Sequence, residues 1–341
     1  MWDFSVSKSI GAMVRTAPYI VVRMAVYFGI ALLYILATGG GGAIGYGLSS
    51  FGDGEGAGAF YGALIGFSGA SGVLYWAREY ILYLVKAGHI AVLTKLYDGA
   101  DLPDGRGQVD YGVEIVKNNF KEASILFGVD QLIKGVLKVI TGVLNTITAF
   151  LPIRAVQTLT NIIGKILTLS LTYVDEIILA YHFRKGDDNV WQSAKEGLVL
   201  YAQNYGKMAK NAVWLWLLMW ILTIVIFFLL LAPALAVINA FPGSAGGWSF
   251  ILAFLVAWSF KAALLEPIAI YALMQAYFKT IEGQEPDAVW EGRLDKASDK
   301  FRELKDKATA FVSSKMGGAS DDPSSSDAGV PDSGHAEQST S

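Results

Sequence analysis

The sequence predicts an all-α, polytopic membrane protein with about six transmembrane helices. Three observations lead to this prediction: an apolar composition, six long apolar segments, and an uneven distribution of Lys and Arg between the loops. Hydrophobic residues make up 53% of the 341 residues and charged residues 17%. The mean hydropathy of +0.43 is far above that of ordinary soluble domains.

The predicted spans form three hairpins, and each approaches or exceeds the ~20 residues that cross a bilayer. The spans are Tyr19–Thr38, Phe60–Val85, Ala123–Phe150, Ala155–Tyr181, Ala212–Leu231 and Trp248–Phe278. A glycine-rich loop, Gly39–Ala59, is expected after the first span, and the second helix is expected to extend to Leu96. A polar helix, Val109–Glu122, leads into the third span, and Pro233 is expected to close the fifth.

The charges in the loops predict the orientation. The loops Gly39–Ala59 and Phe241–Gly247 contain no Lys or Arg, whereas the segments at the opposite ends of the spans contain several. Cytoplasmic loops carry an excess of these residues. We therefore expect a multi-pass protein of the cell membrane with both termini in the cytoplasm.

A first amphipathic helix is expected between spans four and five. Apolar residues recur there every three or four positions, and Asp187, Asp188 or Asn189 is suited to the N-cap. The apolar positions are Trp191, Ala194, Leu198, Tyr201, Tyr205, Met208 and Ala212. This helix is expected along the membrane surface or beneath the bundle.

A second amphipathic helix follows the sixth span. Apolar residues alternate by four and three over 290–311, with charged residues between them. The pattern predicts a helix of about three heptads, suited to a coiled coil or to docking on another subunit. The chain is thus divided into a membrane domain over 1–284, the heptad-patterned segment over 285–314 and a disordered tail over 315–341.

Spans three and four each carry a polar stripe at helical spacing. Charges within a membrane usually face a bundle interior, a partner or a water-filled path. The stripes therefore indicate a hydrophilic path, structural packing against other charged spans, or an amphipathic hairpin lying in the membrane interface. Asp130 and Lys134 are four residues apart and can form an ion pair on one helix face.

The candidate substrate path combines these stripes with one acid from span six. Its residues are Lys134, Lys138, Asn145, Gln157, Asn161, Lys165 and Glu266. Glu266 precedes the helix-breaking Pro267, which indicates equally a functional acid at a kink and a satisfied structural kink. The number of basic residues favours anions or zwitterions as solutes.

Asp175 and Glu176 lie at the cytoplasmic end of span four. They could bind a cation, but we expect them to be solvated at the helix end and to form ion pairs with Arg184 or Lys185.

Gly128, Gly135 and Gly142 recur every seven residues in span three, on a face separate from the polar stripe. Small residues allow helices to approach closely in lipid. Together with the helix over 290–311, this face predicts assembly into a homo-oligomer or with other membrane subunits, within the lipid bilayer.

Several function classes are not expected. The chain has no Cys, and His89, His182 and His335 lack metal-ligand spacing, so we expect no metal, no cofactor and no enzymatic activity. Gly40–Gly45 matches a dinucleotide-binding pattern, but it follows an apolar helix rather than a strand. The net charge of −3 gives no reason to expect a nucleic-acid partner.

Three stretches resemble the choline transporter-like family. Tyr201–Ala212 (YAQNYGKMAKNA) resembles an amphipathic segment of that family, as do the residues from Asn118 to Ile140 and the span end Phe278–Gly283 (FKTIEG). The resemblance covers roughly Asn118–Asp287 and implies transport of a small cationic or amphipathic solute. The family has ten spans and a large external domain, whereas six spans are predicted here.

The sequence therefore predicts a transporter or channel-like protein for a small polar or charged solute. The alternative is a non-transporting membrane anchor or scaffold subunit of a larger complex.

Overall fold

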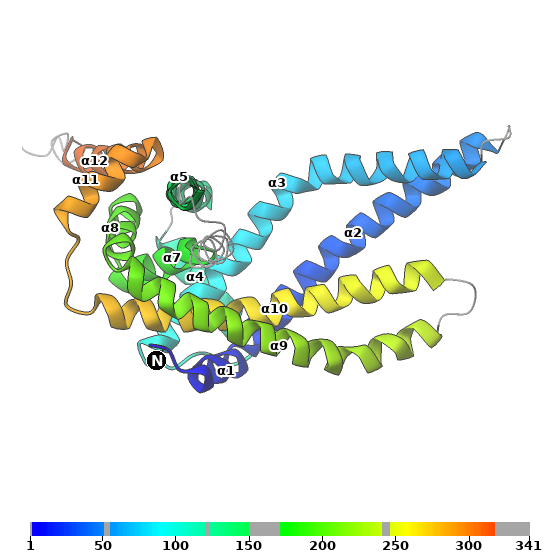
Figure 1. Cartoon of the computed structure of the whole chain (residues 1–341), viewed down its shortest axis with the longest axis horizontal. Helices are drawn as coiled ribbons and strands as arrows, with labels where there is room; N and C mark the ends of the chain where they lie inside the picture. The colour runs from blue at the N-terminus through cyan, green and yellow to red at the C-terminus, as the bar shows by residue number, and fades with distance from the viewer. Residues whose placement is uncertain (1, 51–54, 120–122, 150–170, 241–245, 318–341) are drawn as a thin grey trace, which may run out of the picture.

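The computed structural model describes residues 2–50, 55–119, 123–149, 171–240 and 246–317. All regular structure within these ranges is helical, which confirms the predicted all-α class. Two long helical hairpins project from a helical body (Figure 1). One hairpin consists of α2 (Ala17–Ser49) and α3 (Glu55–Tyr97). The other consists of α9 (Tyr205–Ala240) and α10 (Gly246–Ile281).

The body surrounds the ends of α3 and α10 that lie away from the hairpin tips. Its other helices are α1 (Val6–Arg15), α4 (Arg106–Asn119), α5 (Ala123–Ala149), α7 (Val174–Lys185), α8 (Val190–Gln203), α11 (Ala288–Ala297) and α12 (Asp299–Gly317). The C-terminal half of α10 is buried in its core, where the Tyr277 hydroxyl donates a hydrogen bond of 3.0 Å to the Gly197 carbonyl. This bond joins α10 to α8.

The first predicted amphipathic helix is present as two helices rather than one, because α8 ends at Gln203 and α9 begins at Tyr205 after the C-cap Asn204. Asn189 is the N-cap, and its Oδ1 accepts a hydrogen bond of 3.1 Å from the Gln192 amide. The positions Ala194, Leu198 and Tyr201 are buried. The apolar stripe therefore faces the core of the body rather than open solvent.

The expected glycine-rich loop after the first span is wrong, because α2 continues to Ser49 and α3 begins at Glu55. Glycine costs about 1 kcal/mol within a helix, but here it permits a backbone contact between the two helices. A Cβ atom on Gly62 would lie 2.2 Å from the Gly41 carbonyl oxygen, and one on Gly45 would lie 2.0 Å from that of Gly58. Close packing of the hairpin offsets the loss of helix propensity.

The expected end of the fifth span at Pro233 is also wrong. Helix α9 runs through this position to Ala240. Pro267 likewise lies within the continuous helix α10. Long apolar helices tolerate proline where neighbouring groups satisfy the freed carbonyl.

The heptad-patterned segment does not form one helix, which corrects the prediction of three continuous heptads. Ser298 adopts an extended conformation between α11 and α12, and its hydroxyl accepts a hydrogen bond from the Phe301 amide. Leu294, Phe301, Leu304 and Ala308 are nevertheless buried. They are covered by the body itself, because α12 packs against α8 and α5.

Polar contacts hold the α11–α12 arm on the body. The Asn189 Nδ2 donates to the Ala308 carbonyl over 3.0 Å, and Lys195 Nζ lies 3.2 Å from Glu291 Oε1. The apolar positions that predicted a coiled coil are thus occupied within the chain.

The glycine face of α5 also packs against helices of the same chain. A Cβ atom on Gly135 would lie 2.9 Å from Lys300 of α12, and one on Gly128 would lie 3.6 Å from Trp191 of α8. These two glycines therefore contact the same chain. The surroundings of Gly142 lie outside the described residues, and assembly with other subunits stays a prediction.

Two helices in the described part are long and apolar enough to cross a membrane. They are α2 over Ala17–Ser49 and α9 over Tyr205–Ile226. Only 22% and 17% of their most apolar windows are buried inside the structure. An apolar helix in the core of a soluble protein would be mostly buried, so these two helices weakly indicate membrane association.

We expect Gly62→Ala to destabilise the α2–α3 hairpin by about 1–3 kcal/mol, because the added methyl group meets backbone atoms. Gly47→Ala is the matched control, since a Cβ atom there meets nothing within 4 Å. Thermal unfolding in detergent measures the effect. Equal unfolding temperatures for the two variants would contradict the close contact.

Candidate functional site

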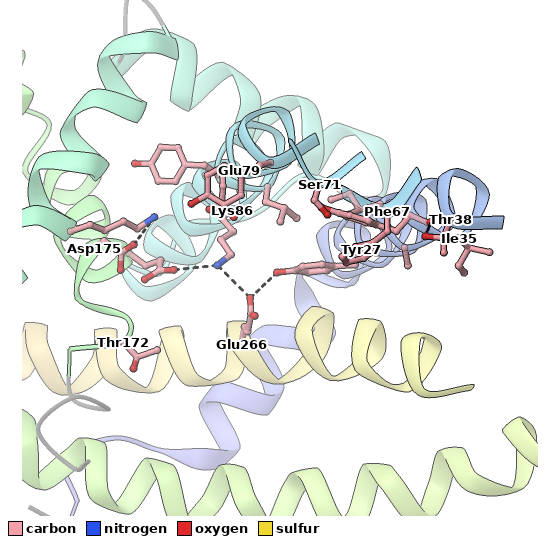
Figure 2. Close-up of a pocket in the computed structure, with 18 residues that line it drawn as sticks. Tyr27, Ile35, Thr38, Phe67, Ser71, Glu79, Lys86, Thr172, Asp175 and Glu266 are labelled. Atoms are coloured by element: carbon pink, nitrogen blue, oxygen red, sulfur yellow. Dashed lines mark hydrogen bonds and ion pairs between the residues drawn. The ribbon is translucent and has the colours of Figure 1, made fainter. Parts of the chain in front are cut away.

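A cavity of about 1090 Å³ lies where α2 and α3 diverge toward the body and α7 and α10 approach them (Figure 2). Its walls combine aromatic side chains with ionisable ones. The aromatic residues are Tyr27, Tyr34, Phe67, Tyr75 and Tyr83, and the ionisable ones are Glu79, Lys86, Lys134, Asp175, Glu176 and Glu266.

Glu266 of α10 is held by groups from two other helices. Its Oε2 accepts a hydrogen bond of 2.7 Å from Arg23 Nη2 and one of 2.9 Å from the Tyr27 hydroxyl, both on α2. Lys86 of α3 lies 3.5 Å from the same oxygen. The Arg23 side chain is 2% exposed, so Glu266 neutralises a charge that water cannot reach. Glu266 is therefore paired within the structure and also lines the cavity, and its functional role stays a prediction.

Asp175 and Glu176 of α7 are buried, which makes the prediction of a solvated helix end wrong. Their predicted partners are engaged elsewhere: Arg184 pairs with Asp98, and Lys185 pairs with Asp187 and Glu196. The first turn of α7 lies against α3 and α5 instead. Its acids are placed at a helix N-terminus, where the helix dipole favours negative charge.

Lysines from α3 and α5 supply the partners of these two acids. Lys86 Nζ lies 3.5 Å from Glu176 Oε1, and Lys134 Nζ lies 3.5 Å from Asp175 Oδ2. Lys134 also forms the predicted pair with Asp130 at 2.8 Å, which confirms that prediction. Lys86 therefore bridges Glu176 and Glu266 across the cavity, as the dashed lines in Figure 2 show.

Glu176 is the least satisfied acid in the cavity wall. The residue is 5% exposed, and its Oε2 atom has no hydrogen-bond partner among the described residues. Burial, followed by the neighbouring Asp175 carboxylate, raises the pKa of Glu176 to about 8. Glu176 lies on α7, a helix of 12 residues that belongs to the body, outside the two long hairpins. A buried acceptor without a donor is costly, so this oxygen favours a proton or a cationic ligand.

Among the described residues around the cavity, carboxyl groups outnumber cations. Four buried or half-buried carboxyl groups, those of Asp130, Asp175, Glu176 and Glu266, face three cations, Arg23, Lys86 and Lys134. Aromatic faces attract cations as well. The arrangement therefore fits a ligand with a positively charged group, and it does not fit the anion preference expected from the sequence.

Only part of the predicted path belongs to this cavity. Lys134 and Glu266 line it, whereas Lys138 is an exposed residue of α5 outside its wall. The side chain of Asn145 lies outside the described residues, as do Gln157, Asn161 and Lys165. Their role in a path stays a prediction.

Arg23, Tyr27 and Lys86 were not predicted as site residues. One signal for them was present, because Arg23 and Lys86 lie at the ends of apolar segments, where a charge needs a partner. Their common partner, Glu266, is 243 residues from Arg23 along the chain, and no local pattern connects the two.

Within the described ranges, no group of His, Asp and Glu side chains is suited to hold a metal ion. No protein-family model, no curated protein and no solved structure matches the chain. The interpretation of the site therefore depends on its own chemistry.

We expect Glu266→Ala to lower the free energy of unfolding by about 3–5 kcal/mol, because it leaves the buried Arg23 charge unpaired. The double variant Arg23→Met/Glu266→Leu should recover most of this loss. Thermal unfolding in detergent is the measurement.

Asp98→Ala provides a control for this prediction. It breaks an ion pair in which the Arg184 side chain is 41% exposed, and exposed pairs contribute only about 0–1 kcal/mol. If Glu266→Ala proved no more destabilising than Asp98→Ala, the buried pair would not have the importance assigned to it.

Proposed function

We propose that the chain inserts into a membrane through the hairpins α2–α3 and α9–α10, while the body lies at the cytoplasmic surface. The support is the exposure of large apolar side chains along the hairpins, among them Leu36, Ile65, Ile221, Phe228 and Leu229. The charge distribution agrees, since residues 39–59 at one tip and 241–247 at the other contain no Lys or Arg.

In this proposal the described residues make four crossings, whereas hydropathy predicted six, and most of the predicted span Ala155–Tyr181 lies outside the described residues. Helix α5 packs against α12 through Gly135 and Lys300, and α12 carries charged residues that hydrocarbon does not solvate. Figure 1 also shows α5 almost end-on, whereas the hairpins lie across the view. Both observations favour an interfacial position for α5, lying along the membrane surface.

Within this arrangement we propose a transporter or channel-like protein that binds a small solute with a positively charged group. The single observation that carries the proposal is the buried, unpartnered carboxylate oxygen of Glu176 in an aromatic-walled cavity between the hairpins and the body. The choline transporter-like resemblance implies the same solute class, but the cavity supports it independently.

The alternative, a non-transporting anchor or scaffold, has less support than the sequence suggested. Its two motivating features were the heptad-patterned segment and the glycine face of α5. The buried residues of the first, and Gly128 and Gly135 of the second, are in contact with the same chain. Binding of a cation without any flux would favour this alternative.

Calorimetry with the full chain in detergent tests the proposed site, with tetraethylammonium as the probe. We expect binding that weakens about tenfold, or ~1.4 kcal/mol, in Glu176→Gln, which keeps the shape of the side chain. Glu114→Gln removes an exposed acid of α4 and should leave binding unchanged. A failure of the unaltered protein to bind the probe would contradict the proposal, and uptake into proteoliposomes then separates transport from binding.

The pH dependence of binding gives a second test. A proton on Glu176 competes with the cation, so affinity should increase as the pH rises through the elevated pKa of about 8. Lys86 and Tyr83 on α3, and Asp130 and Lys134 on α5, face the same carboxyl group. Calorimetry from about pH 7 to about pH 9 should show this increase in the unaltered protein and not in Glu176→Gln. The same pH slope in both would show that another group titrates.

A further inference from the structure

A second cavity, of about 970 Å³, lies on the body at the N-terminal end of the chain and shares no residue with the first. It is formed by α1 and by the ends of α3, α7 and α10 (Figure 1). Basic side chains outnumber acidic ones in its lining, whereas acidic side chains outnumber basic ones in the lining of the first cavity.

Three cations in this wall have no ion pair with any described residue. They are Lys8 and Arg15 of α1 and Lys279 of α10, and all three are exposed to the cavity or to solvent. Residues 8 and 15 are seven apart on one helix, so their side chains lie on the same face. Cations from two separate helices thus converge on one concavity.

A fourth cation, Arg184, is held rigidly in the wall. Its Nε donates to Asp98 Oδ1 over 2.9 Å, and its guanidinium lies 4.6 Å from the centre of the Phe278 ring and 5.2 Å from that of Tyr97. The Arg184 guanidinium is therefore a cation with a fixed position in the cavity wall.

The acids of the wall do not cancel this charge. Asp3 is engaged by Lys210 at 2.8 Å and by Asn211 at 2.9 Å, and Asp98 is engaged by Arg184. The Lys210 hydrogen bond, followed by that of Asn211, lowers the pKa of Asp3. Glu282 is the remaining acid of the lining. The excess charge of the cavity is therefore positive.

We propose that this second cavity binds a phosphate group through Arg15 and Lys279, with Lys8 at its edge. Arginine and lysine are the side chains that proteins use for phosphate, and a concave basic surface raises the local anion concentration. The ligand is the headgroup of an anionic phospholipid or a soluble phosphate ester, which share this chemistry.

The surroundings of the cavity favour a lipid headgroup as the source of the phosphate group. Trp2, Ile10 and Val14 are exposed beside the cavity, as in a helix that lies in a membrane interface. The predicted orientation places this end of the body on the cytoplasmic side, where anionic lipids are concentrated. A soluble phosphate ester would bind in the cavity without contacting these exposed apolar residues.

The test uses the full chain and compares two double variants with the same change in charge. Arg15→Gln/Lys279→Gln removes the proposed ligands. Lys117→Gln/Lys296→Gln removes two exposed lysines of α4 and α11 that have no ion pair with the described residues. Native mass spectrometry measures retention of phosphatidylglycerol against phosphatidylcholine, and calorimetry measures binding of glycerol phosphate.

We expect the first double variant to lose about tenfold in affinity for one of the two phosphate probes, and the second to bind as the unaltered protein does. Loss of phosphatidylglycerol alone identifies the lipid, and loss of glycerol phosphate identifies a soluble ester. The charge-preserving variant Arg15→Lys/Lys279→Arg should keep most of the binding, which excludes misfolding as the cause.

Two results would overturn the proposal. One is that the unaltered protein binds neither phosphate probe above the level of phosphatidylcholine. The other is that both double variants weaken binding equally, because net charge rather than this cavity would then be responsible. Neither result bears on tetraethylammonium binding in the first cavity.

Discussion

The buried charge network around Lys86 is the interaction on which the rest of the structure depends. It connects α2, α3, α7 and α10 through Arg23, Glu266 and Glu176. Charges removed from water must be paired, and deleting one partner costs several kcal/mol. The two hairpins therefore meet the body at this charge network. Glycine contacts join α2 to α3 near the tip of their hairpin. The cavity lies between the charge network and the glycine contacts.

The arm formed by α11 and α12 has a structural consequence of its own. Because Phe301 and Leu304 are fully buried against the body, the arm completes the core of the body. The described charges of the polar stripe of α5 are already accommodated on the body. Lys134 is neutralised by Asp130 and Asp175, and Lys138 is exposed.

The sequence predicted local features well and distant pairings poorly. The apolar stripe of α8, its Asn189 cap and the Asp130–Lys134 pair all depend on residues within two helical turns, and all three were confirmed. The partners of Asp175, Glu176 and Glu266 come from helices far away in the chain, so no local pattern favoured Lys86 over the nearby Lys185. The prediction of a glycine-rich loop was wrong for a similar reason. The helical conformation of these glycines is stabilised by packing against another helix, which local helix propensity does not reveal.

Cysteine accessibility in the first cavity tests the account most directly, because the chain contains no natural Cys. Ser71 lines the cavity, and Ser71→Cys introduces a single reactive thiol there. A positively charged methanethiosulfonate reagent should modify this thiol faster than a negatively charged one, and tetraethylammonium should protect it. Equal rates for the two reagents, without protection, would contradict a cation-selective cavity.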